Sequence, residues 1–478
     1  TIVNVALPVV MKDLGLTGSD AQWLNAAYAL VFAALLVTVG RLGDLYGRRR
    51  LFLAGMLVFV ASSVVAGSAV NPSMLIAARF VQGLGAGMIV PSTLSTLNAV
   101  FTGRSRTIAF AVWGSAIGGM AAIGPLVGGW LATDLSWRWA FWLNIPVGLL
   151  VMIGIVRVVP ETKDTSVVAG TDVPGVILSA LGMGGIVFAL IEGSWFGWWR
   201  SGDGALSPVP IVGVLGALAL VSFVMLELRR SRGGRPVLVD LDLFRLRSFR
   251  SGITAALIVA FGEFGLLFTL PLLLQGTLGF NSLETGWVIL VLAVGTFLIS
   301  GTLPQLSKRI SQRTIVRIGL ALEALAVGGL ALTLSLTVPT WLIAVWLFTY
   351  GVGVGMATAQ LTSLLLADVP VNESGQASGL QSALRQLGSA LGVALLGGVL
   401  VADLAAQTRE RLNTIGMPGA AAEQLTAAVK DSAGIAIAGL QAQPGAEVAA
   451  RAASEAMIHA SQLTTGLAAL ALLVGLLA

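Results

Sequence analysis

The sequence contains no cysteine and only one histidine, His459. These absences exclude disulfide frameworks, Cys/His metal sites and thiol catalysis. A nucleotide-binding P-loop needs a lysine directly after a glycine, and the four lysines, Lys12, Lys163, Lys308 and Lys430, all follow other residues. We therefore expect neither a metal ion nor a cofactor, and any pumping must draw on an ion gradient or a partner ATPase.

Charged residues are also scarce. They make up 11% of the 478 residues, and hydrophobic residues make up 56%, whereas a soluble domain carries about 25% charged residues. A chain this long and apolar cannot cover itself with a hydrated surface, so the lipid bilayer must be its solvent. The net charge of +5 is explained by membrane topology, and we expect no nucleic-acid partner.

Apolar stretches of about 20 residues recur between charged or Pro/Gly-rich breaks, a pattern that predicts transmembrane helices. The sequence predicts an all-α membrane protein with fourteen spans, at residues 1–11, 21–40, 51–69, 74–98, 107–131, 139–158, 174–193, 208–227, 251–275, 285–306, 314–335, 340–364, 379–402 and 459–478. The first stretch is too short to cross about 30 Å at 1.5 Å per residue, and the last apolar run stops at the final residue. We therefore expect the natural chain to continue beyond both ends.

Basic residues are distributed unevenly between the two sets of loops. The loops after even-numbered spans, together with the start of span thirteen at Arg385, hold 20 of the 28 lysines and arginines. Because cytoplasmic loops carry such an excess, we expect both termini to face the cytoplasm. The abundance of alanine and glycine favours a bacterial source, so the expected location is a bacterial cytoplasmic membrane.

Internal repetition organises the chain into two halves. Residues 82–88 read QGLGAGM, and residues 350–356 read YGVGVGM. We predict two related six-helix bundles, at 1–158 and 251–478, separated by two additional spans and a basic cytoplasmic loop at 159–250. Repeats of this kind place a substrate site near the midplane between the bundles.

One segment of the second bundle, 403–458, falls between the last two predicted spans. It is rich in alanine, with apolar and charged residues at helical spacing. We expect an extracytoplasmic helical hairpin here, and a loosely ordered surface loop is the alternative.

The loop between the second and third spans, residues 40–50, reads GRLGDLYGRRR. Gly40 and Gly43 permit a tight turn and close helix approach. Asp44 can accept backbone N–H groups or pair with an arginine such as Arg48, and the arginine cluster holds the loop at an anionic membrane face. The alternative is a basic turn that only sets topology.

Span five contains residues 118–129, which read GGMAAIGPLVGG. Pro125 cannot donate its backbone nitrogen and kinks the helix. Gly124, Gly128 and Gly129 permit close packing against neighbours. An ordinary kinked packing helix is the alternative interpretation.

Three ionisable residues within predicted spans are candidates for ion coupling. Burying Arg79 in span four costs at least ~2.5 kcal/mol unless the side chain snorkels to the interface or finds a partner. Glu263, near mid-depth of span nine, is removed from water, which disfavours the charged form. It could exchange a proton or neutralise a cationic substrate, or it could be a structural hydrogen-bonded residue. Glu323 in span eleven is a further candidate, although that helix could face lipid or pack peripherally. Glu192, beside three tryptophans, fits an interfacial aromatic belt.

Together these motifs resemble the major facilitator superfamily and, within it, the fourteen-span drug:proton antiporters. The resemblance rests on residues 1–8, 40–50, 75–83, 118–129, 136–146 and 378–388. It covers nearly the whole chain except 403–458. The stretch 118–129 is similar to the antiporter signature of the family's exporters, although Met120 stands where the family usually has glycine.

The resemblance implies a major facilitator fold of two six-helix bundles plus two additional helices. Asp44 and Arg48 would form a latch between the bundles, against span thirteen. Arg79 would take part in proton coupling, and Gly124 and Pro125 would form the hinge of span five. The acidic residue of the family's first span would fall two positions before Thr1.

From these observations we expect a secondary active transporter and not an enzyme. It would export small amphipathic or hydrophobic compounds, such as drugs, dyes and antibiotics, by alternating access driven by a proton gradient, as a monomer in the bilayer. A lipid, glycolipid or dedicated natural-product exporter of the same fold is the second hypothesis. A non-transporting membrane receptor or scaffold is the third, and buried Arg79 and Glu263 argue against it.

Overall fold

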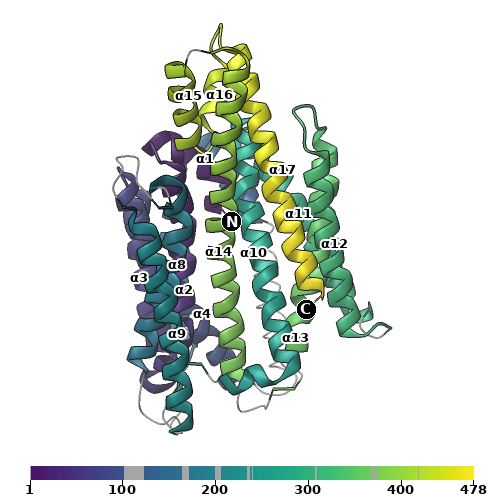
Figure 1. Ribbon diagram of the computed structural model, residues 1–478. Helices are drawn as coiled ribbons and strands as arrows, with labels where there is room; N and C mark the ends of the chain where they lie inside the picture. The colour runs from purple at the N-terminus through teal and green to yellow at the C-terminus, as the bar shows by residue number, and fades with distance from the viewer. Residues whose placement is uncertain are drawn as a thin grey trace.

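The computed structural model describes the chain except for residues 1, 102–122, 164–171, 197, 200–205, 234–236, 240, 307–308, 366–367, 370–373, 418 and 478. Every regular element of this described part is helical. The long helices run roughly along one common direction (Figure 1). This arrangement suits a bilayer, because a helix satisfies its own backbone hydrogen bonds without water.

The first group of helices contains α4, which packs against α2 and α3. It comprises α1 (Ile2–Leu14), α2 (Gly18–Tyr46), α3 (Arg48–Gly67), α4 (Pro72–Val100), a helical stretch at 123–130 that continues into the π-helix η1 (Leu131–Leu135), α6 (Trp139–Trp142) and α7 (Asn144–Val158). Local chemistry fixes where these helices begin. Thr17 and Asp20 form a reciprocal capping box at α2, and Asn71 caps α4 just ahead of Pro72.

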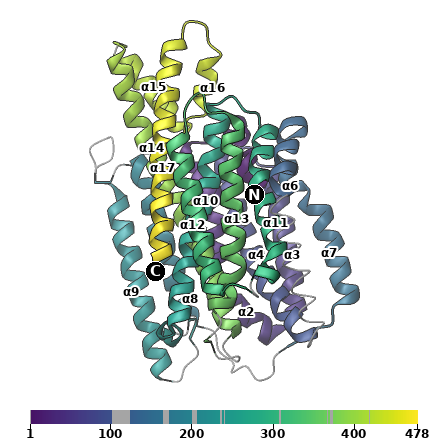
Figure 2. The same ribbon diagram turned by 90° about the vertical axis from the view of Figure 1, so that its right-hand side faces the viewer.

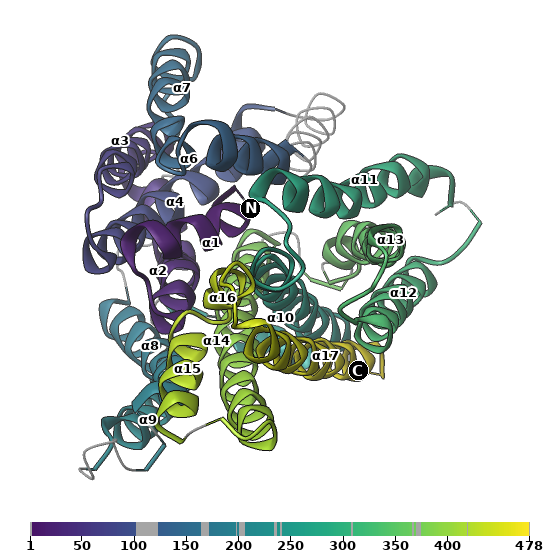
Figure 3. The same ribbon diagram turned by 90° about the horizontal axis from the view of Figure 1, so that it is seen from above.

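The second group of helices surrounds α10 and α14. It comprises α10 (Arg247–Gly276), α11 (Ser282–Leu306), α12 (Gln312–Thr333), α13 (Thr340–Leu365), α14 (Ser374–Thr414) and α17 (Glu447–Leu477). Seen from above, α1–α7 lie on one side and α11–α13 on the other, with α10 between them (Figure 3). Its central place explains why 72% of the residues in the most apolar segment of α10 are buried.

Two further helices, α8 (Val173–Phe196) and α9 (Pro208–Arg232), lie between the two groups in the sequence. They pack against each other. Helix α8 packs against both α2 and α14. Helices α9 and α7 lie at opposite outer edges of the bundle (Figure 2). Only 11% of the residues in the most apolar segment of α9 are buried, and 17% in the segment that contains α7. Such exposed apolar faces are compatible with lipid and not with water. A 3₁₀ turn, η2 (Leu241–Arg245), leads from α9 to α10.

The segment 403–458 is helical. Helix α14 continues to Thr414, α15 (Gly419–Asp431) and α16 (Ala436–Gln441) follow, and α17 begins at Glu447. These helices project beyond one end of the bundle (Figure 1). We call this end the hairpin end. The opposite end, where the chain turns at Gly47, is called the basic end.

Eleven helices in the described part are long and apolar enough to cross a membrane. The other three predicted spans correspond to α1, α2 and 107–131. Of these, α1 has 13 residues, α2 includes side chains outside the described part, and 107–131 falls largely on 102–122. The protein is therefore a multi-pass membrane protein, and the count of fourteen spans stays a prediction.

Candidate functional site

Arg79 is held inside the first group by neutral partners. Its Nε donates to Leu24 O at 3.0 Å, and its Nη1 donates to Gln82 Oε1. Its Cζ lies 4.5 Å from the centroid of the Tyr28 ring, a cation–π contact. The guanidinium thus turns toward α2 and its own helix. These contacts favour a cation held by neutral partners inside the group over one that snorkels to the interface. No carboxylate is paired with it among the described ion pairs.

In the second group, Glu263 forms an ion pair that the sequence did not suggest. Its Oε2 lies 3.3 Å from Arg385 Nη2, and the two side chains are 14% and 38% exposed. The sequence predicts Arg385 among the cytoplasmic basic residues, at the start of span thirteen. The structure instead turns its side chain along α14 toward α10, because a carboxylate there offsets the cost of holding the cation away from water.

Glu323 lies in the same cluster of charges. It interacts electrostatically with both Glu263 and Arg385, although it is fully buried and neither of its carboxyl oxygens has a hydrogen-bond partner in the described part. The expectation that its helix could face lipid is wrong at this residue, because the Glu323 side chain points at α13. There a Cβ added to Gly353 would lie 2.7 Å from Glu323 Cγ.

Tyr350 completes this cluster. Its ring is 1% exposed, and its hydroxyl also lacks a hydrogen-bond partner among the described residues. It interacts electrostatically with Glu323, Glu263 and Arg385. Four helices, α10, α12, α13 and α14, therefore contribute two carboxyl groups, one guanidinium and one phenol to the cluster. Glu323 and Tyr350 are buried, whereas Arg385 is 38% exposed.

The glycines of span five lie where the two groups of helices meet. Gly124, Pro125, Gly128 and Gly129 are all buried. A Cβ at Gly128 would lie 2.7 Å from the carbonyl oxygen of Ile2 in α1, and one at Gly129 would lie 2.5 Å from that of Ser282 in α11. The stretch therefore provides close packing between the groups, and its role as a hinge stays a prediction.

Hydrogen bonds also join the two groups at the hairpin end. Gln275 Nε2 of α10 donates to Val5 O of α1 at 3.0 Å. Leu283 N of α11 donates to Thr133 Oγ1 of η1 at 3.1 Å. In this conformation the groups are therefore closed against each other at the hairpin end.

The loop motif 40–50 is anchored within its own group. Gly47, between α2 and α3, has φ of +116°. Glu161, which follows α7, accepts hydrogen bonds from Arg49 N at 3.0 Å and Arg50 N at 3.2 Å, and so caps α3. Gly43 is buried against α3. The burial of Gly40 and the side chain of Asp44 fall outside the described part, so the latch stays a prediction.

Glu192 is buried and hydrogen-bonded, and its expected place in an interfacial aromatic belt stays a prediction. It is 9% exposed, and its Oε1 accepts from Ser19 Oγ at 2.8 Å and from Trp23 Nε1 at 2.7 Å. Both donors lie on α2, so Glu192 ties α8 to the first group. The need for hydrogen-bond donors was predictable from the sequence, because a carboxylate inside a predicted span requires them. The identity of the donors was not.

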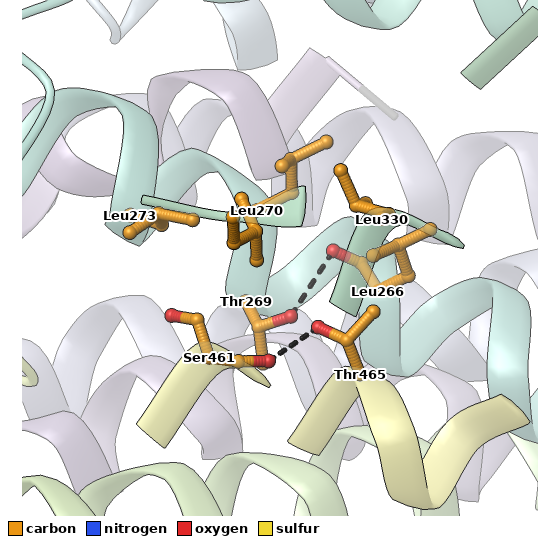
Figure 4. A pocket seen from close by; sticks show the side chains of 8 residues that line it. Leu266, Thr269, Leu270, Leu273, Leu330, Ser461 and Thr465 are labelled. Carbon is orange, nitrogen blue, oxygen red and sulfur yellow. Dashed lines mark hydrogen bonds between the residues drawn. The ribbon is translucent and has the colours of Figure 1, made fainter. Parts of the chain in front are cut away.

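A small cavity lies among α10, α12 and α17 (Figure 4). Its volume is about 10 Å³, enough for roughly one water molecule. It is lined by Thr269, Ser461, Thr465 and leucines. This cavity is too small for a substrate, and a single water there would satisfy the buried Ser461 hydroxyl, which has no partner among the described residues.

A multi-pass bundle that buries ionisable side chains has the architecture of a membrane transporter. Residues 1–393 match the family model described as Major Facilitator Superfamily. The chain therefore belongs to the Major Facilitator Superfamily, and it is a transport protein and not an enzyme.

The chain is similar to bacterial transporters and resistance proteins. It is 36% identical over 421 residues to a probable actinorhodin transporter of Streptomyces coelicolor, covering 85% of this chain and 70% of that protein. It is 37% identical over 431 residues to the puromycin resistance protein pur8 of Streptomyces alboniger, covering 85% and 79%. Further relatives are named as multidrug resistance and antibiotic export proteins.

A solved structure shares the fold. The crystal structure of a bacterial homologue of the human lysosomal transporter Spinster matches with a TM-score of 0.63 and 17% sequence identity. The match covers 100% of this chain and 92% of that one. At this identity the comparison establishes the major facilitator fold alone.

Proposed function

We propose that this protein is a proton-coupled exporter of small amphipathic compounds that works by alternating access in a bacterial cytoplasmic membrane. The relatives named for antibiotic resistance and export support the cargo class, and the span-five stretch supports the direction of transport. The excess of basic residues at the basic end supports a cytoplasmic location for that end and for both termini. In this proposal a single chain with fourteen spans works without a cofactor.

The observation that carries proton coupling is the cluster of Glu263, Arg385 and Glu323. Glu263 forms an ion pair with Arg385. Glu323 is fully buried and its carboxyl oxygens have no donor among the described residues. A carboxyl group in such a site is held in its neutral form, because an unpaired buried charge costs far more. In this conformation Glu323 therefore carries a proton.

Transport follows if the conformational change opens this cluster to water. Glu323 can then release its proton, which leaves the cluster with one net negative charge. A proton and a substrate drive the cycle only if each binds the two states with different affinity. Arg79 would stabilise one of the two states through Tyr28 and Leu24, and Glu263 would hold Arg385 in place.

A dedicated exporter of one natural product is a second candidate. The relatives named for actinorhodin and puromycin favour it, and so does the helical hairpin. A groove of about 470 Å³, lined by residues including Arg411, Arg451 and Glu455, lies there between α14 and α17. Such a groove could extend the transport path beyond the membrane.

The test is substrate flux in proteoliposomes under an imposed pH gradient, with ethidium as the probe. Glu323→Gln keeps the shape of the neutral carboxyl but cannot release a proton. We expect at least a tenfold loss of gradient-driven flux, with downhill exchange retained. Glu423→Gln, an exposed change on α15, is the matched control. Unchanged uphill flux in Glu323→Gln would remove this residue from the mechanism, and an absence of gradient-driven flux in the wild type would refute proton coupling.

A further inference from the structure

Two buried acids at the basic end take no part in the mechanism above. Asp172 directly precedes α8, and Glu227 lies in the last turns of α9. The Asp172 side chain is 1% exposed, and Glu227 is fully buried. They therefore meet where the α8–α9 pair joins the rest of the chain.

Each acid uses one oxygen for hydrogen bonding. Asp172 Oδ1 accepts from Gly175 N at 2.9 Å and pairs with Arg230 Nη1 at 2.9 Å. Glu227 Oε2 accepts from Leu238 N at 2.9 Å and from Val239 N at 3.2 Å. The second oxygens, Asp172 Oδ2 and Glu227 Oε1, are buried and have no donor among the described residues.

These two free oxygens face each other. A Cβ added to Gly175 would clash with Asp172 Oδ2 and would lie 2.7 Å from Glu227 Oε1, so both oxygens lie against the same point of α8. Two ionised carboxylates placed in this way repel each other. One proton between them turns the contact into a short O–H···O⁻ hydrogen bond, which is among the stronger kinds.

We propose that Asp172 and Glu227 bind one proton between them, and that this proton clasps the α8–α9 pair to the second group of helices. With the proton in place, the charges of Asp172, Glu227 and Arg230 sum to zero. Without it, the buried site holds one uncompensated negative charge. This proton site is separate from the Glu323 cluster and does not depend on the proposed export function.

The clasp reaches the second group through the segment after α9. Leu238 and Val239, whose backbone nitrogens bind Glu227, pack in one apolar cluster with Phe249 of α10 and with residues of α13 and α14. At the hairpin end, Glu192 ties α8 to α2 of the first group. The clasp thus adds a contact with the second group at the basic end to the packing of α8 against α2 and α14, so it affects how freely the two groups move.

The clasp should loosen as pH rises. Deprotonation leaves two facing carboxylates, and their repulsion displaces Glu227 from the nitrogens of Leu238 and Val239. Arg230 on α9 is the described cation at the site. Asp242 and Arg245 of η2 pair with each other in an exposed position. The change with pH therefore originates in the acid pair.

The experiment uses the absence of cysteine in the sequence. Val239→Cys introduces a single thiol into the buried cluster, and its rate of maleimide labelling reports opening. The rate is measured from pH 6 to pH 9 in the full-length protein, with and without Asp172→Asn. An asparagine amide can donate to Glu227 Oε1 and so replaces the proton at every pH. The ratio of the two rates cancels the titration of the thiol itself.

We compare the labelling rate of the Val239→Cys protein with that of Val239→Cys/Asp172→Asn. We expect the ratio of the first rate to the second to be near one at pH 6 and to rise at least tenfold by pH 9. Glu227→Gln provides a second, independent replacement of the proton and should give the same rise. Asp242→Asn, a change of an exposed acid in η2, should leave the ratio at one throughout. A ratio that stays at one for both Asp172→Asn and Glu227→Gln would overturn the proposal.

Discussion

Replacing Arg385 with methionine removes the partner of Glu263 while keeping a straight, helix-compatible side chain. The carboxylate of Glu263, 14% exposed, would then remain without its cation. Breaking a fully buried pair costs about 3–5 kcal/mol, and exposed pairs are worth about 0–1 kcal/mol. Arg385 is 38% exposed, so solvent screens part of the interaction. We expect Arg385→Met to lower the free energy of unfolding by about 1–2 kcal/mol.

A double-mutant cycle isolates this interaction from the change in packing. Glu263→Gln removes the charge that Arg385 compensates, so the double variant Glu263→Gln/Arg385→Met holds no unpaired charge at this position. We expect it to recover about 1 kcal/mol relative to the sum of the single variants. The assay is unfolding in detergent, followed by tryptophan fluorescence. If the two single effects simply add, the ion pair contributes nothing and our account of Glu263 is refuted.

Two further predictions concern the ends of the helices. Gly47→Ala should destabilise the protein by about 1–3 kcal/mol, because the residue has φ of +116° and its Cβ would lie 2.7 Å from Glu161 Oε1; thermal unfolding measures this. Asp13 lies beyond the expected first span, and hydrogen bonds from Trp137 and then Arg138 lower its pKa below the ordinary value of 3.8. Its contribution to stability is therefore present above pH 4 and is lost as the pH falls below this value. Asp13→Asn should flatten the pH dependence of stability between pH 5 and pH 3, and an unchanged profile would contradict this assignment.

Apolar runs in the sequence predicted most helices, but not where α14 ends. The predicted span stopped at residue 402, where charged residues begin, whereas α14 continues to Thr414. The reason is helical periodicity beyond the membrane. Leu404, Thr408 and Leu412 recur every four residues and are all fully buried, so this face packs against α15 and α17 although the opposite face is polar.

The candidate site was only partly predictable. The sequence identified Glu263 and Glu323 as costly residues inside apolar spans, which is a local property. It did not reveal that Arg385 pairs with Glu263, because 122 positions separate them and the contact depends on how α10 and α14 are rotated. The donors to Glu192 could not be predicted for the same reason, since they lie on α2, far away in the sequence.

The repeated glycines show how the two groups are related in three dimensions. In the first group, a Cβ at Gly85 of α4 would lie 2.8 Å from Gly55 O of α3. In the second, a Cβ at Gly353 of α13 would lie 2.7 Å from Gly319 O of α12. Corresponding glycines therefore bring corresponding helices into backbone contact, so the sequence repeat reflects equivalent packing.

This equivalence identifies what is special about Glu323. A Cβ at Gly85 would lie 2.7 Å from Phe59 N, and one at Gly353 would lie 2.8 Å from Glu323 N. Glu323 thus occupies the position that Phe59 holds in the first group. Because the same helix contact forms around a phenylalanine, packing does not require a carboxyl group there. A buried acid without hydrogen-bond donors among the described residues destabilises the fold, so its presence at a position that accepts an apolar side chain favours a role in binding a proton.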